Sequence, residues 1–175
     1  YLKDTDLVIL SDYSKGLLDK QLISKIVKLA KEHNKIIITD PKKDDFSIYA
    51  GMDIITPNQK EITDSCNKKV LNDDQLLSYS KYIIKKYKIN NILVTQSENG
   101  MLLVNSKNQY KYKTFARKII DVTGAGDTVI SILGLMIASG MSIRDATLIS
   151  NYAAGITISK KGTANTHIKE MINWK

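Results

Sequence analysis

Short apolar runs alternate along the chain with longer stretches in which apolar residues recur at helical spacing. The apolar runs predict buried strands at residues 7–10, 36–40, 53–56 and 91–95. Helical spacing predicts helices over residues 18–33, 73–87, 128–139 and 143–158. Residues 100–104 and 110–115 flank a polar turn, which is typical of an antiparallel strand pair. This alternation indicates an α/β domain with a largely parallel sheet.

The composition is typical of a single globular domain. The chain has 175 residues, of which 43% are hydrophobic and 25% charged, enough for one core without disulfides. Its single cysteine, Cys66, can form neither an internal disulfide nor a multi-cysteine zinc site, which favours a reducing cytoplasm. No apolar run is long enough to span a membrane, and the start carries no signal-peptide pattern. Because the chain begins at Tyr1 rather than Met, we consider it a fragment of a longer protein.

The net charge of +8 raises the question of nucleic-acid binding. Of the 26 basic residues only Arg117 and Arg144 are arginines, whereas base readout and bidentate phosphate contacts favour arginine. The lysines are also spread over the whole length of the chain. A solvated, lysine-rich surface therefore explains the charge better than a nucleic-acid site does.

The segment from Asp121 to Thr128 carries the clearest chemical signal, because it lies where a loop meets an apolar helix. Gly124, Ala125 and Gly126 allow a close approach of backbone to a ligand, and the free N–H groups of a helix start favour an anion. The segment is not a Walker A loop, since no Gly-Lys-Ser/Thr follows it. It also lacks the third glycine of a dinucleotide fingerprint, where Val129 stands instead.

Asp127 lies inside this anion-binding turn, and two interpretations of it remain open. As a general base, it would take the proton of an attacking hydroxyl while backbone N–H groups hold the phosphate. As an ordinary first-turn acid, it would only complement the helix dipole.

The segment Asp121-Val-Thr-Gly-Ala-Gly-Asp-Thr128 resembles the C-terminal signature of the ribokinase, or PfkB, family of carbohydrate kinases. In that family the Gly-Ala-Gly backbone forms the anion hole and the closing aspartate is the catalytic base. Four further segments occur in the family's order: Leu10-Ser-Asp-Tyr-Ser-Lys-Gly16, Asp40-Pro-Lys42, Thr56-Pro-Asn-Gln-Lys-Glu61, and residues 151–163.

The resemblance implies a ribokinase-like three-layer α/β core over residues 1–175, a single domain that corresponds to the C-terminal part of the kinase domain. The family's N-terminal strands and lid would be absent. Within the family, the motifs look most like the kinases that phosphorylate D-glycero-D-manno-heptose 7-phosphate at the anomeric hydroxyl in ADP-heptose synthesis for lipopolysaccharide. Other sugar kinases of the family, acting on ribose, fructose or a fructose phosphate, remain alternatives. So does a nucleotide-binding module without activity of its own.

The resemblance also implies ATP and Mg²⁺ as cofactors. Asn58 and Glu61 form the family's Asn-x-x-Glu motif, in which Glu61 would hold Mg²⁺ through water; a helix cap with a surface glutamate is the alternative. The other expected nucleotide contacts are Thr95, Ser97, Gly100, Asn151, Gly155, Lys161 and Gly162. The alternatives are a plain β-turn at residues 97–100, where the family often has glycine at Ser97, and simple helix packing at Asn151 and Gly155.

Substrate residues are expected after the first strand, at the sheet edge where open α/β sheets bind ligands. Asp12, Tyr13 and Lys15 stand there, with Lys42 nearby to neutralise phosphate, although a strand-capping turn explains the first group equally simply. Asp121 and Thr123, with the loop around Lys161 and Gly162, are candidates for a site for K⁺ by resemblance. The expected partners are a sugar phosphate and ATP, with no nucleic acid or membrane, and the parent protein is expected to be a homodimer.

Overall fold

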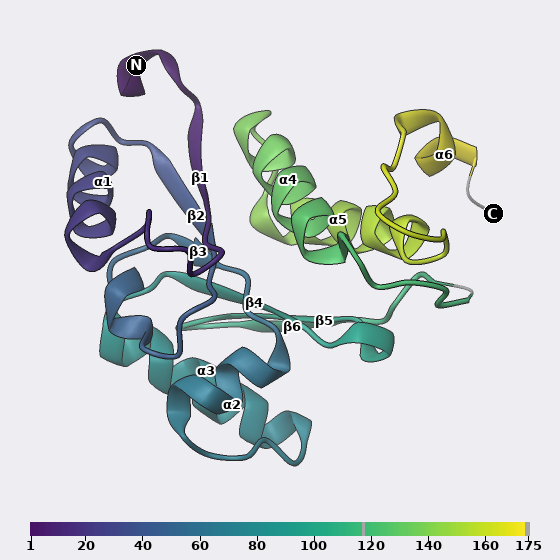
Figure 1. Ribbon diagram of the computed structural model, residues 1–175, viewed down its shortest axis with the longest axis horizontal. Helices are drawn as coiled ribbons and strands as arrows, with labels where there is room; N and C mark the ends of the chain where they lie inside the picture. The colour runs from purple at the N-terminus through teal and green to yellow at the C-terminus, as the bar shows by residue number, and fades with distance from the viewer. Residues whose placement is uncertain (117, 174–175) are drawn as a thin grey trace.

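The computed structural model describes residues 1–116 and 118–173, and within these ranges it contains a six-stranded mixed sheet in the order β1 to β6 (Figure 1). The strands are β1 (Leu7–Ser11), β2 (Ile36–Asp40), β3 (Ile54–Ile55), β4 (Asn91–Thr95), β5 (Met101–Asn105) and β6 (Gln109–Tyr112). Strands β1 to β4 pair in parallel, whereas β4, β5 and β6 pair antiparallel. The predicted α/β architecture with a largely parallel sheet is therefore confirmed.

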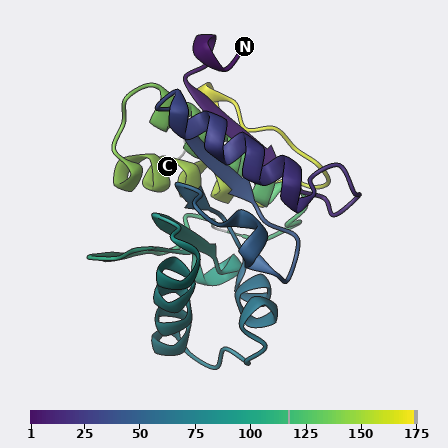
Figure 2. The same ribbon diagram turned by 90° about the vertical axis from the view of Figure 1, so that its left-hand side faces the viewer.

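Helices cover both faces of this sheet and complete three layers (Figures 1 and 2). The helices are α1 (Lys20–Glu32), α2 (Gln59–Cys66), α3 (Asp73–Tyr87), α4 (Ala125–Ala138), α5 (Ile143–Thr157) and α6 (Ile168–Asn173). Helices α1, α2 and α3 pack on one face together with a short 3-10 helix, Phe46–Tyr49, and α4 and α5 pack on the other. Side-chain caps start several of them: Asp19 accepts from Leu22 N at α1, Asn72 from Gln75 N at α3, and Ser142 from Asp145 N at α5.

Alternate residues of each inner strand enter different cores, as the pleat of a sheet requires. Ile37 packs with α1 and α3, whereas its neighbour Ile38 packs with α4 and α5. Leu93 of β4 joins Ile38, and both are fully buried. Because the parallel strands are covered on both faces, their sequences are continuous apolar runs rather than alternating ones.

Several element boundaries differ from the predictions by one or two residues, and three differ in ways that matter for the site or the sheet. Helix α4 begins at Ala125, three residues before the predicted start at Thr128. Gly124 is therefore its N-cap, and Ala125, Gly126 and Asp127 form its first turn rather than a preceding loop. The second hairpin strand ends at Tyr112 instead of Phe115, and β3 is reduced to two residues. Helix α6 and the short 3-10 helices had no prediction.

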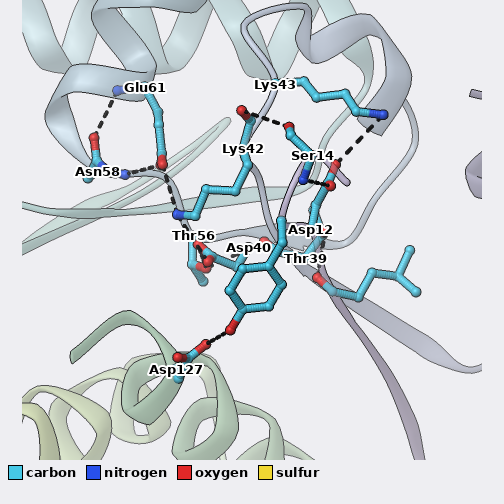
Figure 3. A network of polar contacts seen from close by, with 12 residues as sticks. Asp12, Ser14, Thr39, Asp40, Lys42, Lys43, Thr56, Asn58, Glu61 and Asp127 are labelled. Atoms are coloured by element: carbon cyan, nitrogen blue, oxygen red, sulfur yellow. Dashed lines mark hydrogen bonds and ion pairs between the residues drawn. The ribbon is translucent and has the colours of Figure 1, made fainter. Parts of the chain in front are cut away.

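The carboxyl ends of β1, β2, β3 and β4 lie at one edge of the sheet because these strands are parallel. Asp12 follows β1, Asp40 ends β2 and Thr95 ends β4. The first turn of α4 lies against the same edge, where Asp127 faces the residues that follow β1 (Figure 3). Candidate residues from distant parts of the sequence are therefore brought together at this edge.

Candidate active site

The start of α4 is built to present backbone N–H groups. Gly124 is its N-cap with φ of +80°, a left-handed conformation that a glycine adopts without strain. The Ala125 N–H bonds to Val122 O and the Thr128 N–H to Gly124 O, whereas the Gly126 and Asp127 N–H groups have no acceptor among the described residues. Gly126 has a helical conformation, so no backbone strain requires glycine there. A Cβ built on it meets nothing within 4 Å, so the absence of a side chain leaves open space beside the helix start. The helix thus offers two free donors at its positive end.

Asp127 occupies the third position of α4 and is exposed to solvent. Its Oδ1 accepts a hydrogen bond of 3.0 Å from the phenol of Tyr13, a residue that follows β1. Tyr13 is itself 60% exposed. The catalytic and substrate candidates of the sequence therefore meet here directly.

Asp12 is 2% exposed, and both oxygens of its carboxylate accept hydrogen bonds from other residues of the protein. Oδ1 accepts from Ser14 N at 2.7 Å and Oδ2 from the Tyr49 phenol at 2.7 Å, with Lys43 Nζ 4.0 Å away. Burial, followed by the hydrogen bond to Asp12, raises the pKa of Tyr49 well above its ordinary value. Asp12 thus fixes the loop after β1 internally, while Lys15 lines an open pocket beside Tyr13 and Leu17.

Lys42 lies between two carboxylates (Figure 3). Its Nζ is 2.9 Å from Glu61 Oε1 and 3.2 Å from Asp40 Oδ2. Asp40 is 6% exposed, and burial raises its pKa to about 6 against the opposing effect of Lys42. Burial acts to lower the pKa of Lys42, but the hydrogen bond to Glu61 and the charge of Asp40 outweigh it, so this pKa is raised. The Lys42 side chain therefore contacts Glu61, the predicted Mg²⁺ residue, instead of lying on the substrate side with Lys15 as expected from the sequence.

Asn58 and Glu61 form a capping box at the start of α2. Asn58 Oδ1 accepts from Glu61 N at 2.9 Å, and Glu61 Oε2 accepts from Asn58 N at 2.8 Å. The helix-cap interpretation describes the observed geometry, in which the cap uses Asn58 and one glutamate oxygen while the other oxygen accepts from Lys42. The role of Glu61 in holding Mg²⁺ stays a prediction. Among the described residues, no cluster of three or more His, Cys, Asp or Glu side chains is arranged to hold a metal.

A pocket lies between the end of β4, the hairpin, and the helices α4 and α5. It brings together five predicted nucleotide residues and two of the anion hole: Thr95, Ser97, Gly100, Asn151, Gly155, Ala125 and Gly126. Its apolar walls come from residues without a sequence prediction, among them Met101, Val122, Val129 and Ile158. Val122 lies in the segment 121–128 and Ile158 in the segment 151–163, both of which carry the family resemblance. Membership of these segments was the one sequence signal that could have identified them as pocket residues.

The turn after β4 has conformations that only particular residues adopt. Ser97 has φ of +49°, a left-handed conformation that glycine adopts with less strain than serine. Gly100 has φ of +87°, and a Cβ built on it would stand 2.0 Å from Tyr112 O, so the hairpin excludes any side chain. The segment is thus a turn, as one interpretation expected, and it also lines the pocket. Its contact with nucleotide stays a prediction.

The small residues of α5 have packing reasons of their own. Asn151 is buried, and its Nδ2 donates to Lys113 O at 2.8 Å. A Cβ on Gly155 would lie 3.0 Å from Ala116 N, because the segment after the hairpin crosses the helix there. Their place in the pocket wall thus depends on a chain crossing that the sequence pattern did not reveal.

Lys161 and Gly162 lie outside this pocket. The Gly162 N–H donates to Asp121 Oδ2 at 3.0 Å, and the Thr123 N–H donates to Oδ1 at 2.9 Å. The bonds with Thr123, followed by that from Gly162, lower the pKa of Asp121. Asp121 therefore ties the entrance of α4 to the loop after α5, and a K⁺ site at these residues stays a prediction.

The sequence of the chain matches a known protein family over almost its whole length. A family model described as pfkB family carbohydrate kinase matches residues 1–170. The chain belongs to this family. It is 37% identical over 174 residues to the Bifunctional protein HldE of Campylobacter fetus, a match that covers 99% of this chain and 38% of that protein. The chain thus spans little more than a third of this relative.

Solved structures show the same fold at low identity. The ribokinase of Arabidopsis thaliana, solved with ribose and ATP, superposes with a TM-score of 0.86 at 18% identity. The match covers 98% of this chain and 56% of the ribokinase chain. Phosphofructokinase-2 of Escherichia coli, solved with potassium, has a TM-score of 0.83 at 19% identity, covering 95% of this chain and 55% of its own. Among the described residues, no helix has both the length and the apolar character that a membrane crossing needs.

Proposed function

We propose that this chain is the catalytic part of an ATP-dependent sugar kinase that phosphorylates D-glycero-D-manno-heptose 7-phosphate at its anomeric hydroxyl. One observation carries the kinase chemistry: Ala125 and Gly126 line the pocket, while Asp127, the next residue, faces Tyr13 on the side of β1. A single helical turn thus carries both the N–H donors for a phosphoryl group and the base for the acceptor. Phosphoryl transfer needs this arrangement of donor, phosphoryl group and acceptor in line.

The proposed reaction uses these groups as follows. Asp127 takes the proton from the anomeric hydroxyl as its oxygen bonds to the γ-phosphorus of ATP, and the bond between that phosphorus and the β,γ-bridging oxygen breaks. The free N–H groups of Gly126 and Asp127 stabilise the negative charge on the transferred group. ADP and heptose 1,7-bisphosphate are the products.

Asp40 and Glu61 suit a hard divalent cation, because they already share one cation, the Lys42 ammonium. These two carboxylates would hold Mg²⁺, and Mg²⁺ bound there would neutralise charge on the phosphates of ATP. For K⁺, the backbone around Asp121 and Gly162 is the candidate place, and activity measured in K⁺ and in Na⁺ would test it.

The heptose assignment rests on the motif resemblance and on the relative named HldE. Lys15 lines the acceptor side and is available for an anionic substituent such as the 7-phosphate. A panel of sugars and sugar phosphates tested with the full-length protein would check this. Turnover confined to free ribose or fructose would contradict the heptose assignment but not the kinase assignment.

We further propose that residues 1–175 are one part of a longer protein, since the chain spans 38% of that relative. The family resemblance supports a homodimeric state and a cytoplasmic location as proposals for that longer protein. The alternative of a nucleotide-binding module without activity predicts ATP binding without transfer. Calorimetry with ATP and Mg²⁺, beside a phosphorylation assay on the same preparation, separates the two.

Asp127→Asn in the full-length protein tests the mechanism most directly. The variant keeps the size of the side chain and the N–H donors but cannot accept the proton, so kcat should fall by about 10²- to 10⁴-fold. Its dissociation constant for ATP and its melting temperature should change little.

A matched control exists at α5. Asp145 holds the same third position of a helix, where it accepts a hydrogen bond from the cap Ser142 at 2.7 Å. Asp145→Asn should leave kcat unchanged. If Asp127→Asn also keeps kcat within about threefold of wild type, Asp127 is an ordinary first-turn acid and the proposed mechanism fails.

A further inference from the structure

The ammonium of Lys42 lies between two carboxylates. It lies 3.2 Å from Asp40 Oδ2 and 2.9 Å from Glu61 Oε1. Neither carboxylate is free to turn away. Asp40 is buried at the end of β2, and the second oxygen of Glu61 is held by the backbone N–H of Asn58.

Two fixed carboxylates on one cation constitute a cation site. Mg²⁺ and Mn²⁺ require oxygen ligands, and an ammonium group supplies none. A divalent cation therefore cannot share this position with Lys42 and has to displace it. Displacement moves a positive charge away from two negative ones, which opposes metal binding as long as the ammonium has no other anion to pair with.

The side chain of Lys42 can move, although its backbone cannot. The Lys42 N–H donates to the Tyr49 phenol at 3.1 Å, and its carbonyl accepts from the Ser14 hydroxyl at 3.3 Å. The four-carbon stem beyond these contacts is flexible, and the side chain is about one-third exposed. A phosphate group near the start of α4 would offer the ammonium a new partner.

We propose that Lys42 is an internal cation that keeps the Asp40–Glu61 pair closed to divalent metal until nucleotide phosphates draw the ammonium away. This inference rests on the proposed function, because the nucleotide supplies the phosphates. Lys42 is then a positioning residue that makes metal binding depend on nucleotide binding, and by linkage the reverse holds as well. In the absence of nucleotide, the site holds its own cation and stays preformed.

Lys43 provides a matched control. Its ammonium contacts Asp12 and the carbonyl of Leu18, and among the described residues it makes no ion pair with Asp40 or Glu61. Substitution of Lys43 removes the same charge from the adjacent position without opening the proposed site. Any effect of net charge alone appears equally in both variants.

The test measures Mn²⁺ binding to the full-length protein without nucleotide, from the electron paramagnetic resonance signal of free Mn²⁺. Lys42→Met should bind Mn²⁺ about tenfold more tightly than wild type or better, because one positive charge leaves the site. Lys43→Met and Lys42→Arg should stay within about twofold of wild type. Lys42→Gln replaces the methionine variant if circular dichroism shows that the latter does not fold.

Two outcomes overturn the inference: neutral variants of Lys42 that bind Mn²⁺ no more tightly than wild type, or an equal gain in Lys43→Met. Sugar phosphorylation by the wild type, measured on the same preparation, keeps the two proposals apart. An inactive wild type together with a gain in Lys42→Met contradicts the proposed function alone. An active wild type without that gain contradicts the cation exchange alone.

Discussion

The phenol of Tyr13 donates a hydrogen bond of 3.0 Å to the carboxylate of Asp127 and so joins the loop after β1 to the first turn of α4. Both side chains are exposed, so the bond contributes little to stability. Its importance lies in orientation, because it fixes the carboxylate at the place where an acceptor hydroxyl would arrive.

Tyr13→Phe removes this donor and retains the ring. We expect kcat/KM for the acceptor sugar to fall by about tenfold, the equivalent of roughly 1.5 kcal/mol for a hydrogen bond to a charged group. The dissociation constant for ATP and the melting temperature should be unchanged. Tyr112→Phe, which removes a phenol that donates to Arg144 O, is the control. Equal kinetics for Tyr13→Phe and wild type would show that the bond plays no part in transfer.

The buried carboxyl of Asp40 predicts a pH dependence of stability. Burial raises its pKa from 3.8 to about 6, so between about pH 4 and pH 6 the folded protein keeps a proton that the unfolded chain has released. Its contribution to the free energy of unfolding therefore falls as pH rises through this window and is constant above it. The full change is about 2 to 3 kcal/mol.

Asp40→Asn cannot ionise and should lack this dependence. Without metal or nucleotide, the melting temperature of the variant relative to wild type should rise from pH 4.5 to pH 6.5 and then level off. A difference that stays constant over this range would mean that Asp40 is ionised throughout.

The two glycines at the start of α4 should respond differently to alanine. Gly124 has φ of +80°, so Gly124→Ala should cost about 1 to 2 kcal/mol of stability. Gly126 is helical with open space beside it, so Gly126→Ala should keep or slightly raise the melting temperature. The added methyl group lies where phosphate would approach and should weaken ATP binding several-fold. Loss of stability in Gly126→Ala, or unchanged ATP binding, would contradict this account.

Ser97 carries strain that glycine would relieve. With φ of +49°, Ser97→Gly should raise stability by about 1 kcal/mol, whereas Ser97→Ala keeps the strained backbone and should not. If the hydroxyl contacts nucleotide, calorimetry should show weaker ATP binding in both variants. A stabilised Ser97→Ala would argue against backbone strain as the cause.

Local patterns predicted the elements well because their causes are local. The run Ile36-Ile37-Ile38 indicated a buried strand, and the two cores receive Ile37 and Ile38 separately. The start of α4 was placed three residues late, since glycine is a poor helix former, and a left-handed N-cap at Gly124 lets the helix begin earlier.

The candidate site was predictable only as a set of motifs. Their order indicated which residues belong together, and the pocket contains five of the predicted nucleotide residues. The contacts between motifs were not predictable, because they join distant positions: Gly162 to Asp121 across 41 residues and Tyr13 to Asp127 across 114. Lys42 was assigned to the sugar side for the same reason, since nothing in the sequence near it indicates Glu61.

The strand order of the sheet has a consequence for how the protein is made. Each strand pairs with the next one along the chain, so the sheet can assemble in the order in which the ribosome delivers it. Helices α4 and α5 follow the whole sheet in the chain, and until they dock, the sheet face with Ile38, Ile54 and Leu93 is open to water. Docking of α4 therefore does two things at once: it covers this apolar sheet face, and it brings Asp127, the proposed base, to the sheet edge. A nascent chain that still exposes this apolar face also has an incomplete active site.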